Sequence, residues 1–147
     1  MISEFKGDHI RMWVHLEEKG MAPELYSFEL VRNTVEFKME IIEGKNLNDI
    51  TNDLWGMRES VDVIRPFSLI ILNDLLELYS KMGDGGFTHG DLHSGNVMLT
   101  RDMTLKVIDF GSARNFKNID SKQHIRRVQN DMVELIRIFT ALYSGYR

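Results

Sequence analysis

Apolar residues recur three and four positions apart in three stretches of the chain, the spacing that turns one face of an α-helix toward a core. This pattern predicts helices over residues 5–19, 61–82 and 131–143, and a short helix is also expected over 47–54. The apolar face of the longest predicted helix consists of Ile64, Phe67, Ile71, Leu75, Leu78 and Met82. Pro66 lies near the start of this helix, where a proline is tolerated.

The first and last predicted helices have shorter apolar faces. In the first helix the inward residues are Ile10, Trp13, Val14 and Leu16. In the last helix they are Met132, Leu135, Ile136, Phe139 and Leu142. Asp131 stands directly before the last run, so it is a candidate N-cap whose carboxylate accepts a backbone hydrogen bond. The basic pair Arg126 and Arg127 is expected on a solvated surface.

Residues 26–31 and 35–41 alternate apolar and polar side chains, which is the pattern of half-buried β-strands. The residues 32–34 between them predict a tight hairpin turn. Residues 97–99 and 105–108 predict a second pair of short strands. The resulting order is helix, hairpin, short helix, long helix, hairpin and helix, which indicates a mixed α+β fold.

The composition is that of a soluble globular protein, because 43% of the 147 residues are hydrophobic and 27% are charged. This length fits a single domain. The formal net charge of −4 lacks the basic excess of a nucleic-acid-binding protein, so no nucleic-acid partner is expected. The chain has no cysteine, which rules out disulfides and thiolate zinc sites.

No stretch of the chain is apolar enough to suggest a membrane partner. The longest apolar run, residues 68–72, is far shorter than the roughly 20 residues of a membrane-spanning helix. Residues 1–8 lack the apolar stretch of a signal peptide. We therefore expect a soluble protein in the cytoplasm.

One segment concentrates chemistry-bearing residues at fixed offsets. It reads His89-Gly-Asp91-Leu-His-Ser-Gly-Asn96 and is followed by Val107-Ile-Asp109-Phe-Gly111. This set resembles the catalytic loop and the metal-binding loop of the protein-kinase-like superfamily. The resemblance is closest to atypical branches that carry His-Gly-Asp in place of His-Arg-Asp. These branches include aminoglycoside and choline kinases, RIO-type kinases, lipopolysaccharide-core kinases and minimal bacterial-effector kinases.

The resemblance implies an α+β, protein-kinase-like fold in one truncated domain over residues 1–147. Residues 1–44 would be a remnant small lobe and hinge, made of a helix plus a β-hairpin. Residues 45–147 would be a shortened, mostly helical large lobe. The glycine-rich loop and the strand lysine of complete kinases are missing. The carboxylate that would pair with that lysine cannot be assigned among Glu4, Asp8, Glu17 and Glu18.

The resemblance also implies ATP and Mg²⁺ as cofactors and three catalytic residues, which are Asp91, Asn96 and Asp109. Asn96 and Asp109 would hold the metal, since Mg²⁺ prefers hard oxygen ligands such as carboxylates and carbonyl oxygens. The two residues flank the strands of the second predicted hairpin, so a hairpin places both beside one ion. Asp91 would accept the proton of the substrate hydroxyl or orient that hydroxyl for attack.

Further contacts to the nucleotide are implied on two sides of the site. Glu43 and Gly44 lie in a segment whose backbone would meet adenine. His93 would contact a phosphate or the substrate. Phe110 and Gly111 would pack the metal-binding loop and let its backbone turn, with a positive φ at Gly111.

A zinc site is the rival interpretation of the same segment. His89, Asp91 and His93 alternate along the chain, so in a strand they would share one face and could hold Zn²⁺. The glycine and serine residues around them make a poor strand, however, and the downstream Asp109 motif would stay unexplained. His89 is therefore expected to be a structural hydrogen-bonding residue. In protein kinases an aspartate at the position of Asp131 also braces the catalytic loop.

Two functions remain open from the sequence. A phosphotransferase would move a phosphoryl group from ATP to a hydroxyl of a protein Ser or Thr or of a small molecule, and the three retained motif residues favour it. An inactive kinase mimic would bind a protein partner through apolar residues that a lost small lobe exposes. A homo-oligomer fits either function, and a fragment of a longer kinase is a third option. Without the usual arginine beside Asp91, phosphorylation of an activation loop is not expected to control activity.

Overall fold

The computed structural model describes residues 4–146, with side-chain environments from residue 7 onward. The helices are α1 (Glu4–Glu17), α2 (Leu47–Gly56), α3 (Val61–Asp84) and α4 (Ser121–Ser144). The strands are β1 (Leu25–Val31), β2 (Thr34–Met39), β3 (Gly44–Asn46), β4 (Phe87–Thr88), β5 (Val97–Thr100), β6 (Leu105–Val107) and β7 (Arg114–Asn115). Two 3₁₀ turns span Ser94–Asn96 and Phe116–Asn118.

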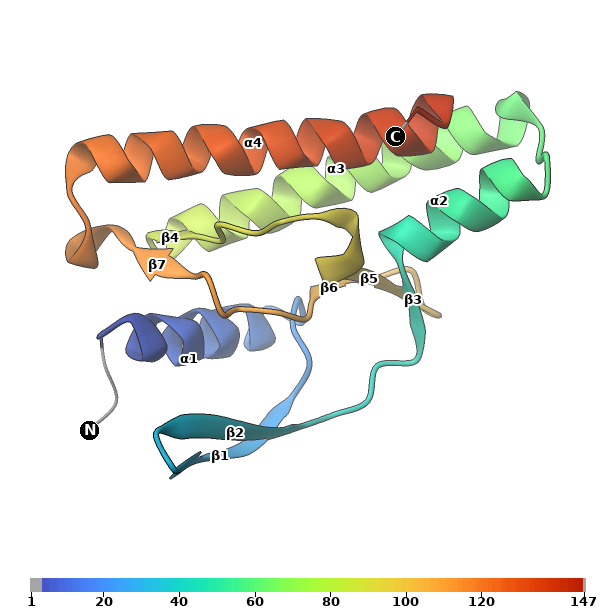
Figure 1. The fold of residues 1–147 in the computed structure, drawn as a ribbon. Coiled ribbons are helices and arrows are strands. Elements are labelled where there is room, and N and C mark those ends of the chain that lie inside the picture. Colours follow the sequence, from blue (N-terminus) through green and yellow to red (C-terminus); the bar gives the residue numbers. More distant parts are fainter. Residues whose placement is uncertain (1–3, 147) are drawn as a thin grey trace.

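The two long helices α3 and α4 lie side by side along one side of the molecule, while α1 and the β1–β2 hairpin lie on the opposite side (Figure 1). Between these layers, β3, β5 and β6 form an antiparallel sheet in that order. The predicted order of helices and hairpins and the mixed α+β class are confirmed. No helix among the described residues is long and apolar enough to cross a membrane.

The long helix α3 buries the face that its apolar spacing predicts. Ile64, Ile71 and Leu75 are fully buried, and Phe67 is half-buried at the margin of the core. Ser60 caps the helix, because its hydroxyl accepts a hydrogen bond from the backbone N–H of Asp62. Pro66 lies in the second turn without ending the helix.

Helix α4 begins ten residues before the predicted start at 131. Its N-cap is Asp120, which forms a capping box with Gln123, so the prediction that Asp131 is the N-cap is wrong. The first ten residues are mostly polar, which hides the helical period from an apolar pattern. The buried stripe of α4 consists of Asp131, Leu135, Ile138 and Leu142.

Two residues predicted to face the core are exposed instead. Ile136 of α4 is 59% exposed, and Val14 of α1 is 39% exposed. In α4, the buried stripe contains a carboxylate, Asp131, so counting only apolar residues shifts the expected face by part of a turn. In α1, Met12 takes the inward position.

The β1–β2 hairpin turns through Arg32 and Asn33, whose φ values of 51° and 66° are those of a two-residue hairpin turn. Phe28 pairs with Phe37 across the strands, and Leu30 pairs with Val35. The hairpin therefore has one apolar face, of which Phe37 packs on Trp13 of α1. Other apolar residues of this segment are exposed: Tyr26, Phe28, Leu30, Met39 and Ile41.

Three short strands have no counterpart in the sequence pattern. Strand β3 pairs with β5, and β4 pairs with β7. A Cβ at Gly44 would overlap the carbonyl oxygen of Leu99, so only glycine fits this position of the β3–β5 ladder. Their two or three residues are too few to show an alternation, and only the tertiary pairing defines them.

Candidate active site

His89 links the two loops of the predicted motif. Its ring is fully buried; Nδ1 accepts a hydrogen bond from the backbone N–H of Asp91 at 3.1 Å, and Nε2 donates to the carbonyl of Asp109. An accepting Nδ1 and a donating Nε2 are the two nitrogens of a neutral imidazole. Burial lowers the pKa of His89, while the hydrogen bond to Asp109 and the charge of Asp131 partly offset that effect. The expected structural role of His89 is confirmed.

Asp131 holds the same loop from the side of α4. Its buried carboxylate accepts three hydrogen bonds, from the backbone N–H groups of His89 and Gly90 at 2.8 and 2.9 Å and from the Tyr79 hydroxyl at 2.8 Å. Burial and the neighbouring Asp131 both raise the pKa of Tyr79, so the phenol stays a donor. The expectation that Asp131 braces the loop is confirmed.

The residue between His89 and Asp91 must be a glycine for steric reasons. Its φ is +87°, and a Cβ there would overlap the guanidinium of Arg127. Arg127 is half-buried; its Nε donates to Thr88 Oγ1 at 2.7 Å and its Nη2 to the carbonyl of Ser112 at 2.6 Å. The prediction that Arg127 belongs to a solvated surface is wrong, because this guanidinium connects Thr88, which directly precedes His89, with the segment after Asp109.

Asn96 and Asp109 stand at neighbouring ends of the β5–β6 hairpin, as predicted. The backbone N–H of Ile108 donates to the carbonyl of Asn96 at 3.1 Å, and Asp109 follows directly. The Asn96 side chain is 7% exposed, and its Nδ2 donates to the carbonyl of Asp91 at 2.8 Å. These contacts place the three motif segments at one location.

Asp91, His93 and Asp109 present their side chains at the surface of this site. The carboxylate of Asp91 lies 3.8 Å from Nε2 of His93. Nδ1 of His93 accepts a hydrogen bond from the N–H of Gly95 at 3.0 Å, which orients Nε2 toward Asp91. On the other loop, Oδ1 of Asp109 accepts from the N–H of Gly111 at 2.9 Å.

The remaining predicted cofactor residues occupy different environments. Phe110 is fully buried and stacks on Trp13 with the ring centroids 5.3 Å apart, so its contribution is to pack the loop. Gly111 does not have the predicted positive φ; its N–H forms a turn with Asp109 instead. Glu43 is exposed beside Arg101 at 3.9 Å, and Gly44 lies in the β3 ladder.

His9 of α1 is a site neighbour that the sequence did not single out. Its half-buried ring lies 4.7 Å from that of Phe37 and 6.0 Å from that of Trp13, measured between ring centroids. Burial lowers the pKa of His9, and the charge of Asp109 acts in the opposite direction. The four-residue spacing of His9 and Trp13 on one helix face was the available signal.

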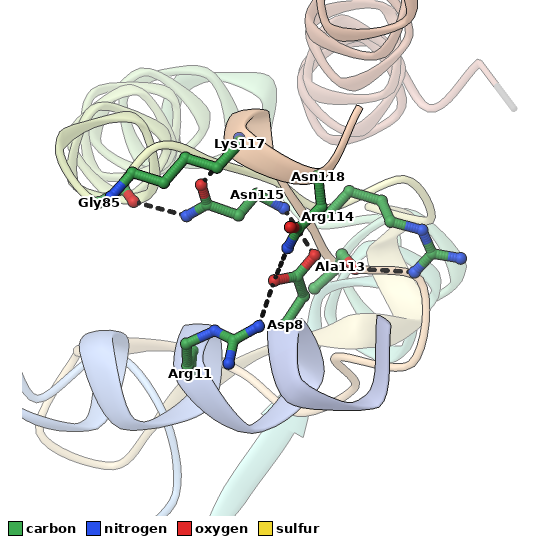
Figure 2. Close-up of polar contacts among 8 residues, drawn as sticks. All are labelled: Asp8, Arg11, Gly85, Ala113, Arg114, Asn115, Lys117 and Asn118. Carbon is green, nitrogen blue, oxygen red and sulfur yellow. Dashed lines mark hydrogen bonds and ion pairs between the residues drawn. The ribbon is translucent and has the colours of Figure 1, made fainter. Parts of the chain in front are cut away.

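Asp8 is the buried carboxylate of α1 (Figure 2). It accepts hydrogen bonds from Arg11 at 2.9 Å, from the backbone N–H of Asn115 at 3.0 Å and from Nδ2 of Asn118 at 2.8 Å. Burial opposes its charge, but these donors together hold the pKa of Asp8 below its ordinary value. Asp8 thus fastens α1 to the segment that follows Gly111.

The other carboxylates considered as the lysine partner lie elsewhere. Glu17 accepts a hydrogen bond from the N–H of Leu25 at 3.4 Å, and Glu18 is exposed. The side chain of Glu4 lies outside the part of the chain whose side chains are described.

The zinc interpretation is wrong. Among the described residues, no three His, Asp or Glu side chains are grouped to hold a metal ion. Both ring nitrogens of His89 are occupied by hydrogen bonds inside the protein.

A catalytic-type loop joined to a metal-binding-type loop by a buried histidine, and braced by an aspartate of a long helix, defines a kinase-like domain. The chain belongs to the ABC1 atypical kinase-like domain family, whose family model matches residues 28–135. The matched range contains every residue of the predicted motif.

The chain is also similar to curated protein kinases. It is 31% identical over 129 residues to cysteine-rich receptor-like protein kinase 5 of Arabidopsis thaliana, which covers 85% of this chain and 19% of the relative. It is 35% identical over 95 residues to cyclin-dependent kinase 11 of Dictyostelium discoideum, covering 57% and 26%. A third relative is dual specificity protein kinase zakA of Dictyostelium discoideum, at 31% over 111 residues, covering 74% and 13%. The chain therefore spans about a quarter or less of the length of these relatives.

Proposed function

We propose that the chain is an ATP- and Mg²⁺-dependent phosphotransferase that acts on a hydroxyl of a protein Ser or Thr or of a small molecule. The observation that carries this proposal is the hydrogen-bonded convergence of Asp91, Asn96 and Asp109 on one location. Membership of a kinase-like family supports it. In finer detail, α1 with the β1–β2 hairpin would correspond to a truncated small lobe and α2–α4 to a shortened large lobe.

The residues present fit a Mg²⁺ ion that would bind together with the nucleotide. Nδ2 of Asn96 is bonded to the carbonyl of Asp91, so Oδ1 is the atom of this amide that would bind the metal. Asp109 is exposed at the adjacent strand end and would supply a carboxylate oxygen. One carboxylate and one amide suit Mg²⁺, which keeps waters and phosphate oxygens as its other ligands. When bound, Mg²⁺-ATP supplies the transferable γ-phosphoryl group with its charge partly neutralised.

Asp91 would act on the acceptor hydroxyl. Its carboxylate is exposed beside the metal-binding residues, where it would orient the acceptor hydroxyl and take its proton. The acceptor oxygen forms the new bond to phosphorus, the bond to the leaving ADP oxygen breaks, and the released proton passes to Asp91. His93, whose Nε2 lies near this carboxylate, would contact a phosphate or the acceptor. The hollow of about 410 Å³ beside Ile42 and Glu43 is lined mostly by charged residues, which are Glu40, Glu43, Arg101, Asp102 and Lys106, so the adenine contact would rest on the backbone of this segment.

Calorimetric titration with Mg²⁺-ATP tests this proposal. We expect saturable binding that requires Mg²⁺ and is lost in Asp109→Asn. Asp84→Asn is the matched control, since Asp84 is exposed at the end of α3 and lies outside the motif. Asp91→Ala should keep nucleotide binding and lose phosphoryl transfer. No binding at millimolar nucleotide would reject the proposal.

The exposed hairpin favours a second candidate function, that of an inactive kinase mimic. Tyr26 and Ile41 are 62% and 92% exposed, and Phe28 and Leu30 add further apolar surface on the same segment. Such a surface is typical of a site that a partner covers. Sedimentation of the chain and of Leu30→Glu tests the simplest case, a second copy. This candidate predicts concentration-dependent association that the substitution abolishes, together with no nucleotide binding.

A further inference from the structure

Three arginines line one hollow on the surface of the molecule. The hollow has a volume of about 350 Å³ and is lined by Arg114, Asn118, Ile119, Gln123, Arg126 and Arg127. Strand β7 contributes Arg114, and the first turns of α4 contribute Arg126 and Arg127. None of Asp91, Asn96 and Asp109 lines it.

Two of the three guanidinium groups, those of Arg114 and Arg127, are held in place before any ligand binds. Arg127 is fixed by its hydrogen bonds to Thr88 and Ser112, both to neutral oxygens. Nη1 of Arg114 donates to the carbonyl of Ala113 at 2.8 Å. Figure 2 shows that the Arg114 side chain extends away from the Asp8 cluster. Fixed donors lose little conformational freedom on binding, which favours recognition of a small anion.

Two carboxylates that contact residues of the lining are engaged in structural hydrogen bonds. Asp8 accepts from Asn118, and Asp120 accepts from the backbone of Gln123 in the capping box of α4. Asp131 influences Arg127 electrostatically, yet its own oxygens accept from Tyr79 and the catalytic loop. Among the described side chains, no carboxylate lies within 4 Å of the cationic nitrogens of Arg126 or Arg127.

We propose that this hollow binds a phosphate group, either as free phosphate or as the monoester of a small metabolite. Guanidinium groups present parallel N–H donors that match the oxygens of a phosphate, and three of them converge here. The side-chain amide of Gln123 adds a further polar group to the wall. An anion bound here would contact the guanidinium of Arg127, which also donates to the carbonyl of Ser112, three residues after Asp109.

Calorimetric titration of the chain with inorganic phosphate, at constant ionic strength maintained with chloride, tests the site. We expect saturable binding that weakens about tenfold or more in Arg126→Gln and in Arg114→Gln, since each removes charge-assisted hydrogen bonds. Arg101→Gln is the matched control, because the Arg101 side chain is 84% exposed on the β5–β6 turn. Parallel titrations with glycerol 3-phosphate and O-phosphoserine distinguish a monoester from free phosphate.

Two outcomes overturn the proposal. One is the absence of saturable binding of any of these three ligands in the millimolar range. The other is an equal loss of affinity in Arg101→Gln, which would show that phosphate responds to the overall surface charge and not to this hollow. Circular dichroism of each variant verifies that it is folded. Asp109→Asn removes a residue of the proposed nucleotide site and leaves the lining of the hollow unchanged. Phosphate binding that persists in this variant therefore tests the hollow independently of the nucleotide proposal.

Discussion

At Asp131 a single buried carboxylate organises the loop on which the proposed chemistry depends. It accepts from the Tyr79 hydroxyl and from two consecutive backbone N–H groups of the loop, so every donor that faces it is satisfied. Buried carboxylates are stable only when such donors compensate for lost hydration. Position 131 therefore tolerates substitution far less well than its place in a polar stretch of helix suggests.

Asp131→Asn should lower the free energy of unfolding by about 2–3 kcal/mol, because an amide offers one acceptor oxygen to three donors and leaves buried N–H groups unsatisfied. Tyr79→Phe removes only one of the three hydrogen bonds and should cost about 1 kcal/mol. Urea denaturation of both variants measures the difference. Equal losses would show that the loop N–H groups do not depend on this carboxylate.

His9 and His89 make the stability of the fold depend on pH. The pKa of each lies below its ordinary value of 6.5. On acidification the unfolded chain therefore binds a proton at each histidine at a higher pH than the folded chain does. Their contribution to stability is complete above the unfolded pKa and is lost as the pH falls below about 6.5. Each histidine can contribute a slope of at most about 1.4 kcal/mol per pH unit.

Urea denaturation at pH 7.5 and 5.5 should show this loss of stability on acidification. His9→Phe keeps an aromatic ring beside Trp13 and Phe37 but cannot titrate, so its stability should decline less over the same interval. An identical decline in the chain and in the variant would show that His9 does not contribute.

Strand β3 shows how an element can exist without a local signal. Its three residues, Gly44 to Asn46, include no apolar side chain, and their strand conformation comes from pairing with β5. Gly44 is required because the backbone of Leu99 occupies the space of a Cβ. The same contact sets where the chain enters α2, whose N-cap is Asn46.

Gly44→Ala should destabilise the fold by about 2 kcal/mol, as expected for a group forced into occupied space. Gly83→Ala in α3 is the matched control, because a Cβ there meets nothing within 4 Å. That control should gain about 0.5–1 kcal/mol from reduced freedom of the unfolded chain. Thermal denaturation of the two variants should therefore shift in opposite directions.

Over the whole molecule, burial is distributed unevenly between the two sides. Helices α3 and α4 contribute the interior apolar stripes, while most residues of β1 and β2 are exposed. The hairpin is a two-stranded sheet that rests on α1 mainly through Phe37. Isolated two-stranded sheets are only marginally stable in water.

Hydrogen exchange should reveal this gradient directly. We expect amides in the buried turns of α3 and α4 to exchange at the rate of global unfolding, and amides of β1 and β2 to exchange much faster through local opening. Mass spectrometry of peptides that cover the two regions measures both rates. Equal protection would mean that the hairpin is covered in solution, which supports the association tested with Leu30→Glu.

The sequence alone determined the order of the four helices and the two hairpins, the hairpin turns and the motif with its offsets, because these depend on short-range periodicity and on fixed spacing along the chain. It also determined that Asn96 and Asp109 lie together, since a hairpin of known length leaves little choice. The early start of α4 had a local signal as well, the pairing of Asp120 with Gln123, but one outside any apolar period.

The tertiary structure alone decided which polar residues are interior. Asp8, Asp131 and Arg127 have polar side chains of the kind expected at a surface, yet each is buried or half-buried and makes at least one hydrogen bond to a residue 39 or more positions away. Pairing at that distance depends on how helices and loops meet, and nothing in the neighbouring sequence records it. The same long-range packing excluded a side chain at Gly90 and brought the arginines of the proposed phosphate site together.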